Sequence, residues 1–140
     1  MARMTTHGLS ELMADLDALA DASGEITDNI LLAGALEIKR EWIAAIRKQG
    51  LVDTGEMVAS VAYGKRPRSD GELKKIVVYP MGVDSKGVRN AQKAFVHNYG
   101  HPGRGIKMTR FIDDAERRVQ PKLERRVDEV YDAELKKRGF

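Results

Sequence analysis

The chain has 140 residues, no cysteine and a formal net charge of +3; 42% of its residues are hydrophobic and 32% are charged. This composition suits one domain with a modest core. It excludes disulfides and thiolate metal sites, so we expect synthesis in a reducing cytoplasm. No apolar run approaches the roughly 20 residues of a membrane-spanning helix, and the first ten residues lack a signal-peptide core. We therefore expect no membrane partner and no export by that route.

The charge is distributed unevenly along the chain. Residues 1–60 carry 5 basic and 10 acidic side chains, residues 61–110 carry 11 and 3, and residues 111–140 carry 8 of each. A charged surface that faces water is the commonest meaning of such runs. The alternative is that residues 61–110 form a basic surface facing nucleic acid or the acidic surface of another subunit.

Two helices are predicted before residue 50. The first has an apolar stripe at spacings of three and four, with acidic residues on its other side: Leu9, Leu12, Leu16 and Leu19 against Asp15, Asp17 and Asp21. Ser23-Gly24 interrupts this pattern. Thr27 or Asp28 would cap a second helix, which would end before Gly50.

A long antiparallel hairpin is predicted next. Apolar residues alternate over Met57–Tyr63, a turn-rich loop follows, and a β-branched run occupies Ile76–Tyr79. The densest basic cluster, made of Lys65, Arg66 and Arg68, would lie at the hairpin tip. Because an isolated two-stranded hairpin is marginal in water, a further strand or a neighbouring subunit should complete the sheet.

The rest of the chain predicts an irregular loop and two helices. Residues 81–89 show no periodicity, and we expect this loop to be mobile. Residues 90–99 fit a short helix that ends at Gly100. Thr109 would cap a long last helix, in which Pro121 should kink or split the chain because proline lacks an N–H. The residues that would anchor this helix to the body are Phe111, Ile112 and Ala115.

These elements together predict an α+β fold. It would comprise two N-terminal helices, a long antiparallel hairpin in a small sheet, a short helix and a long kinked C-terminal helix. We expect one domain over residues 1–140, with residues 121–140 as a C-terminal helical extension.

The triplet Asp53-Thr54-Gly55 is the one that carries the catalytic aspartate in pepsin-like and retroviral proteases. Such a protease needs two carboxylates that share one proton. It also needs the triplet on a loop of a nearly all-β body, whereas here the triplet follows a long helix. Asp, Thr and Gly are also residues that turn a chain. We therefore predict a helix-to-strand turn and keep a dimeric aspartic protease using Asp53 as the less favoured alternative.

No other set of residues predicts catalysis or a bound group. His97 and His101 have the i, i+4 spacing of two metal ligands on a helix, but Gly100 and Pro102 should break the helix there. We expect no cofactor and no metal site, and a protein that is not an enzyme. The roles of the two histidines stay open.

Three segments share their order with the motifs of a known family. A segment like Pro-x-Asp-Thr-Gly-x-Leu-x-x-Ser-Ile corresponds here to Asp53, Thr54, Gly55, Met57, Ser60 and Val61. A later segment like Tyr-Ala-x-x-Val-Glu-Phe-Gly-Thr, a proline-containing loop and Phe-x-x-x-Ala correspond to Ala94, Val96, Asn98, Tyr99, Gly100, Pro102, Phe111 and Ala115. The opening segment, from Gly8 to Leu19, looks like a Gly-Leu-x-x-Leu signature. In these segments the chain resembles the head–tail joining proteins of long-tailed bacteriophages, also called neck, tail-component or tail-completion proteins. It departs from them at Leu51, Asn98 and His101, where proline, an acid and threonine are usual.

This resemblance implies a virion structural protein without catalysis, made in the host bacterial cytoplasm and located at the head–tail junction. Such proteins assemble as a ring, commonly six-fold, around the DNA exit path. The implied partners are adjacent connector or head-closure proteins and tail-tube or tail-terminator proteins, with DNA passing through the lumen without sequence-specific binding. Ring size, and the choice among neck, tail-completion and tail-terminator roles, stay open.

A small DNA-binding protein that uses the basic region 61–110 is a competing function. The sequence has no helix-turn-helix or zinc pattern, and aromatic residues make up only 6%, which disfavours base stacking. We expect Lys65, Arg66 and Arg68 to contact a protein neighbour in preference to DNA, because a conduit that gripped DNA tightly would hinder its passage.

Overall fold

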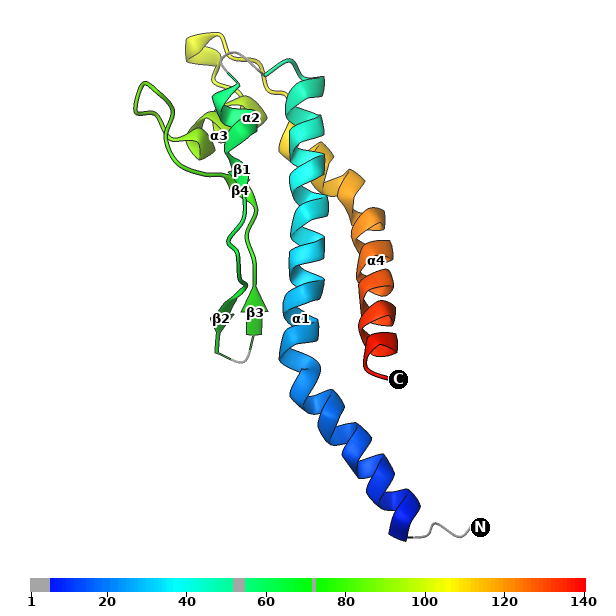
Figure 1. Ribbon diagram of the computed structural model, residues 1–140. Helices are drawn as coiled ribbons and strands as arrows, with labels where there is room; N and C mark the ends of the chain where they lie inside the picture. The colour runs from blue at the N-terminus through cyan, green and yellow to red at the C-terminus, as the bar shows by residue number, and fades with distance from the viewer. Residues whose placement is uncertain (1–5, 52–54, 72) are drawn as a thin grey trace.

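The computed structural model describes residues 6–51, 55–71 and 73–140, with side chains from residue 22 onwards except at Asp70. Two long helices run side by side (Figure 1). The hairpin and the first short helix pack against the first long helix, and the second short helix packs against the second long helix. The elements in chain order are α1 (Thr6–Lys48), α2 (Glu56–Ser60), β1 (Val61–Ala62), β2 (Arg68–Asp70), β3 (Leu73–Lys75), β4 (Tyr79–Pro80), α3 (Asn90–Tyr99), a 3-10 turn (Pro102–Arg104) and α4 (Phe111–Lys137). The expected α+β class is confirmed. Among the described residues, no helix is long and apolar enough to cross a membrane.

The two predicted N-terminal helices are one helix, so the predicted break at Ser23-Gly24 is wrong. A glycine inside a helix costs about 1 kcal/mol relative to alanine. Here a tertiary contact offsets that cost, because the Lys74 ammonium on the hairpin donates to the Gly24 carbonyl (3.2 Å) and to the Asp28 carboxylate (2.8 Å). The Thr27 hydroxyl does not cap a helix and instead donates to the Ser23 carbonyl one turn earlier (2.8 Å).

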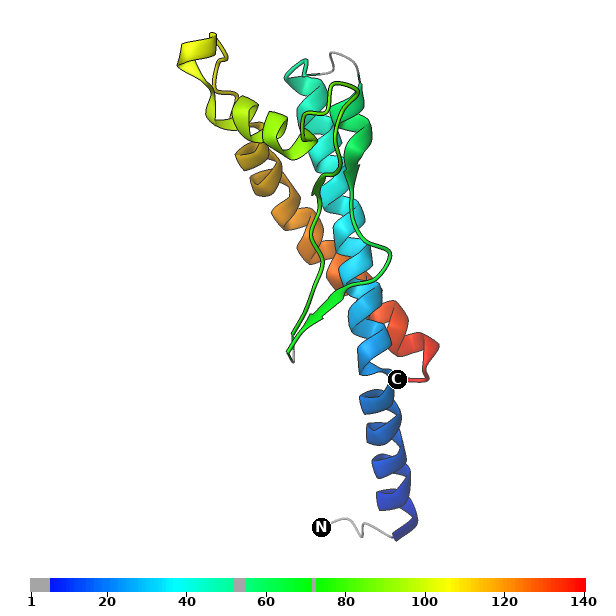
Figure 2. The ribbon, with the colours of Figure 1, turned by 90° about the vertical axis from the view of Figure 1, so that its left-hand side faces the viewer.

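Helices α1 and α4 form an antiparallel pair that supports the rest of the chain (Figures 1 and 2). At one end of the pair, the Arg138 guanidinium lies 3.0 Å from the Glu25 carboxylate, and the Asn29 amide donates to Glu134 (2.8 Å). The helices approach closely at Gly34, where an added Cβ would lie 3.2 Å from a methyl group of Leu123. Both views show that the first turns of α1 continue past the C-terminus of α4.

Helix α4 runs through Pro121 without being split. In Figure 1 its first turns run obliquely and its later turns run alongside α1, as expected for a kinked helix. Proline removes one backbone hydrogen bond. Contacts on both sides of Pro121 keep the helix continuous: Val119 is buried, and the Lys122 ammonium pairs with the Glu41 carboxylate on α1.

The hairpin is built from two short antiparallel ladders, β1 with β4 and β2 with β3. Val61 pairs with Pro80 in the first ladder, and Arg68 pairs with Lys75 in the second. Five residues, 63–67, therefore lie opposite only three, 76–78, and the longer arm must bulge.

Two details of the predicted hairpin are wrong. Met57 to Ser60 are helical, because Gly55 adopts a left-handed conformation (φ 78°) and α2 begins directly after it. Met57 and Val61 are both buried, and their spacing of four suits a helical turn as well as an alternating strand. The cluster Lys65, Arg66 and Arg68 lies along the longer arm, because the tip is formed around Gly71, between β2 and β3.

The core lies where the hairpin base, α2 and α3 meet the two long helices. Phe111 is fully buried, and its ring meets Trp42 edge-on, with the centroids 5.9 Å apart. Ala115 is also buried, and Ile112 packs against the same cluster. The buried apolar members of the cluster are Ala45, Ile46, Met57, Val61, Ala94, Phe111 and Ala115.

Candidate functional site

The triplet at the end of α1 is only partly described. Asp53 and Thr54 lie outside the described residues, so their roles as turn residues or as protease residues stay predictions. Gly55 is described, and its φ of 78° lies in the region that favours glycine. This conformation is compatible with the predicted turn, although the turn leads into α2 and not directly into a strand.

A groove on the hairpin gathers part of the predicted basic cluster. Its volume is about 430 Å³, and it is lined by Gly64, Arg66, Arg68, Lys75, Ile76, Val77, Tyr79 and Met81. We call this set of residues the hairpin groove. Lys65, Arg66 and Arg68 are exposed, and none of them forms an ion pair with a residue that the structure describes. The groove therefore combines apolar side chains with two arginines, Arg66 and Arg68, that have no partner in the described chain.

The hairpin arm that includes β3 and β4 exposes apolar side chains on one side. Leu73, Val77 and Tyr79 are 75%, 55% and 41% exposed. The alternate residues Ile76 and Val78 are half-buried. Together with Val77 they line a cavity of about 390 Å³ toward α1 and α4, and this cavity shares Ile76 and Val77 with the hairpin groove. Alternation of this kind buries one face of an extended arm. The other face, with Leu73, Val77 and Tyr79, is not covered by any of the described residues.

A second apolar surface lies around the end of α3. Phe95 and Tyr99 are 58% and 54% exposed, and their rings stack with centroids 5.7 Å apart. The Arg110 guanidinium lies 5.4 Å from the centre of the Tyr99 ring, a cation–π distance, and Met108 is also exposed. We call Phe95, Tyr99 and Met108 the aromatic patch.

The loop at residues 81–89 has no helix or strand, as predicted, but it is organised around a buried carboxylate. The Asp84 carboxylate accepts backbone hydrogen bonds from Lys86 (2.8 Å) and Val88 (2.9 Å) and pairs with the Lys93 ammonium on α3. Its side chain is only 3% exposed. The hydrogen bond from Lys93 is the main reason that the pKa of Asp84 lies below its ordinary value.

Replacing Asp84 with asparagine should lower the free energy of unfolding at pH 7. The difference from the wild-type protein should become smaller as the pH is lowered. A carboxyl group whose pKa is lowered on folding stabilises the folded state above its unfolded pKa of about 3.9, and loses that contribution as the pH falls through the folded value. Urea unfolding of both proteins between pH 7 and pH 3 would measure this difference. The control is Asp132→Asn, at an exposed position on α4, for which we expect no such loss at pH 7.

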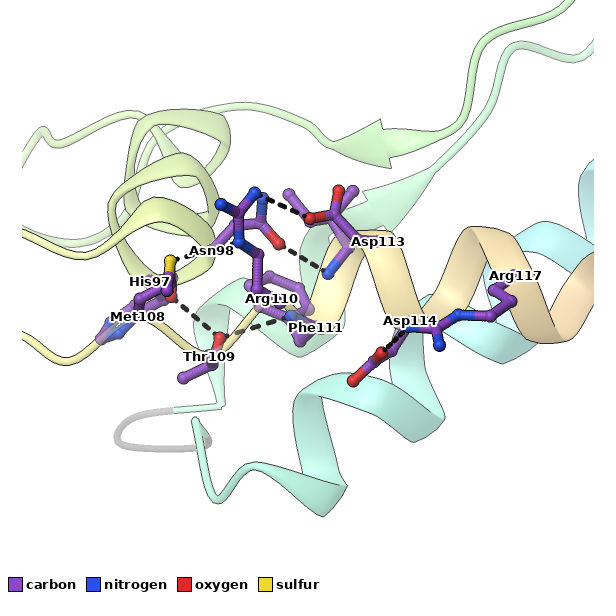
Figure 3. A network of polar contacts seen from close by, with 10 residues as sticks. His97, Asn98, Met108, Thr109, Arg110, Phe111, Asp113, Asp114 and Arg117 are labelled. Atoms are coloured by element: carbon purple, nitrogen blue, oxygen red, sulfur yellow. Dashed lines mark hydrogen bonds and ion pairs between the residues drawn. The ribbon is translucent and has the colours of Figure 1, made fainter.

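The start of α4 is capped by a side chain from α3 (Figure 3). The Asn98 side-chain oxygen accepts a hydrogen bond from the backbone N–H of Ile112 (3.0 Å), as Figure 3 shows. The Thr109 hydroxyl donates to the His97 carbonyl (2.8 Å) and lies 3.4 Å from the Phe111 nitrogen. The predicted cap at Thr109 is therefore a weak, secondary contact. Asn98 is fully buried, and its side-chain nitrogen has no partner among the described residues.

Asn98→Ala should lower the free energy of unfolding by about 0.5–2 kcal/mol, the range for losing a helix-capping side chain. The physical reason is that the N–H of Ile112 would lose its acceptor in a buried site. Thermal or urea unfolding would measure the loss. Gln92→Ala, at an exposed position on the same helix, is the control and should change stability little. Equal stabilities of the two variants would contradict the capping role.

The two histidines are not brought together as ligands. His97 is half-buried on α3, and burial together with the nearby Lys93 lowers its pKa. His101 is exposed after the helix has ended at Gly100. The described part of the chain contains no group of three or more His, Asp or Glu residues placed to hold a metal ion.

The sequence analysis did not identify Asp84 and Asn98, whose side chains accept hydrogen bonds from backbone N–H groups of the 81–89 loop and of α4. Asp84 lies in a Gly-x-Asp-x-x-Gly turn, where aspartate often bonds nearby backbone N–H groups, so a signal existed. Asn98 acts on a helix that begins 13 residues later, and no local pattern encodes that contact.

Comparisons of the chain with protein-family models, curated proteins and solved structures find no match.

Proposed function

We propose that this protein is a virion structural subunit that assembles into a ring at the head–tail junction of a long-tailed bacteriophage. In that role it joins head to tail around the DNA conduit and has no catalytic activity. Six-fold symmetry is the first expectation, taken from the family that the sequence resembles. Its other partners would be an adjacent connector or head-closure protein and a tail-tube or tail-terminator protein.

The observation that carries the self-assembly part of this proposal is the hairpin with one uncovered apolar face. Its ladders hold only two and three residue pairs, and an isolated hairpin of this kind is marginal in water. Leu73, Val77 and Tyr79 leave that face open to a partner. A neighbouring subunit that covers this face would bury apolar area and stabilise the hairpin at the same time.

The aromatic patch lies on another part of the surface and supports contacts with more than one neighbour. Aromatic and methionine side chains are enriched at protein interfaces. A subunit with two different contact surfaces makes head-to-tail interfaces, and these close into a ring when the rotation between neighbours allows it. The assignment to the head–tail junction rests on the motif resemblance alone.

DNA binding is the second candidate function, because Lys65, Arg66 and Arg68 are exposed and unpaired within the described chain. Phosphate groups could serve as partners for these cations, and such binding would weaken steeply with added salt. The same three residues would serve a protein partner with acidic groups equally well.

The test is to purify the full chain and follow its mass by sedimentation velocity over a wide concentration range, with electron microscopy of the same samples. We expect closed rings with rotational symmetry. A strictly monomeric protein at the highest concentration, with no rings in the images, would overturn the proposed assembly. Salt-dependent binding to duplex DNA by that monomer would favour the second candidate.

A further inference from the structure

We infer that the hairpin groove of one subunit binds the acidic N-terminal segment of α1 from a neighbouring copy of the same chain. This inference rests on the proposed ring and names the contact between its subunits. The segment is residues 6–21, which form the first part of α1.

The groove itself defines the chemistry of its occupant. Its apolar lining comes from Ile76, Val77 and Tyr79, while Arg66 and Arg68 contribute exposed positive charge. Between the ladders, residues 63–67 and 76–78 belong to no strand, and Gly64, Arg66 and Val77 there are exposed to a partner. An occupant should therefore present apolar side chains and carboxylates together.

The N-terminal segment of the chain has this composition. Residues 6–21 contain four carboxylates and no lysine or arginine, together with the apolar stripe found in the sequence. The acidic and apolar residues of this segment are Glu11, Asp15, Asp17 and Asp21, and Leu9, Leu12, Leu16 and Leu19. The carboxylates at the start of α4 are engaged within the subunit, Asp113 by Arg110 and Asp114 by Arg117 (Figure 3).

The segment cannot reach the groove of its own subunit. Helix α1 is continuous, and Lys74, near the hairpin tip, bonds to Gly24 and Asp28. The groove lies on the other side of Lys74, toward the hairpin base, whereas residues 6–21 continue away from it for about 24 Å at the rise of an α-helix. Figures 1 and 2 both show this part of α1 extending past the hairpin tip. A continuous helix does not fold back on itself, so the groove it meets must belong to another copy.

In the proposed ring this contact is head-to-tail, because each copy gives its segment to one neighbour and its groove to the other. Opposite charges on the two surfaces favour this pairing over segment-to-segment or groove-to-groove contacts. The apolar area would supply most of the binding free energy, since exposed ion pairs contribute little singly.

The experiment reverses charges on each side and then combines them. The groove variant is Arg66→Glu with Arg68→Glu, the segment variant is Asp15→Lys with Asp17→Lys, and the control is Arg118→Glu with Arg125→Glu at exposed positions on α4. We expect each of the first two to raise the concentration for half-assembly about tenfold, because two attractive pairs become repulsive. The control should assemble like the wild type. Circular dichroism and melting curves would show that all three keep the fold.

An equal mixture of the groove and segment variants should recover assembly. In that mixture, a wild-type segment can meet a wild-type groove and a lysine segment can meet a glutamate groove. Because the chain has no cysteine, a mixture of Ala20→Cys and Val77→Cys proteins gives a second readout, which is a disulfide-linked mixed dimer.

Several outcomes would overturn the inference. One is wild-type assembly of the groove variant, and another is failure of the mixture to recover. A third is cross-linking of Ala20→Cys only to itself, which would mean that two segments pair with each other. Loss of DNA binding without loss of assembly would assign the groove to nucleic acid. Absence of rings from the wild-type protein would instead refute the proposed function.

Discussion

Phe111→Ala is expected to lower the free energy of unfolding by about 3–5 kcal/mol, the range for removing a large aromatic ring from a well-packed core. Phe111 is fully buried, meets Trp42 edge-on and belongs to the cluster that joins α4 to α1, α2 and α3. The substitution would leave a cavity where all these elements meet. Because they hold one another in place, the surrounding side chains should move little into that cavity, and most of the cost should remain. Urea unfolding monitored by circular dichroism would measure the change.

The matched control is Phe95→Ala, because Phe95 is 58% exposed on α3 and its ring stacks on Tyr99. We expect this variant to keep most of its stability while losing affinity between subunits, if the aromatic patch contacts a neighbour. Similar destabilisation by both substitutions would show that Phe111 does not have the anchoring role that its burial indicates.

Gly100→Ala is expected to cost about 2–6 kcal/mol, because backbone strain and overpacking each cost about 1–3 kcal/mol. Gly100 has φ 78° and ψ 166°, a conformation that is essentially restricted to glycine. An added Cβ would lie 2.9 Å from the backbone nitrogen of Met108 and 3.2 Å from the carbonyl oxygen of Ile106. Backbone atoms cannot rotate away from this contact as a flexible side chain could.

Gly105→Ala is the comparison without crowding, at a left-handed position (φ 69°, ψ 20°) that strains alanine less than the conformation of Gly100 does. Gly105 also has a positive φ, 69°, but a methyl group added there would meet no atom within 4 Å, so we expect a loss of only about 1 kcal/mol. Melting temperatures of the two variants would give the comparison. If Gly105→Ala costs as much as Gly100→Ala, the close approach of residue 108 is not what requires glycine at position 100.

Periodicity predicted the helices of this protein well where apolar residues repeat over several turns. The α3 boundaries, including the end at Gly100, follow from local sequence because glycine readily adopts the positive φ needed there. The strand predicted from Met57 failed because residues 57 and 61 lie on one face in either a strand or a helical turn. The position of Gly55 before them was the local signal that favoured a helix start.

The sequence identifies the basic cluster but not its place in the hairpin, and whether the cluster is a binding site stays a prediction. Lys65, Arg66 and Arg68 were recognised as a basic cluster, and their placement at the tip was wrong because the tip depends on how the two arms pair. Pairing Arg68 with Lys75 shifts the tip to Gly71 and opens the arms around residues 63–67. A register of this kind is set by contacts along the whole hairpin and by its packing on α1.

By itself, the sequence determined the α+β class, the apolar stripe of α4, and the acidic N-terminal and basic middle parts of the chain, because composition and periodicity are local properties. Only the tertiary structure decided that α1 is continuous, since Lys74 bonds to Gly24 and Asp28 from 50 and 46 positions away. It likewise decided that Asn98 caps α4 and that Asp84 is buried against Lys93. Each of these outcomes depends on a polar group that finds its partner on another element, and such partners are fixed by packing and not by neighbouring residues.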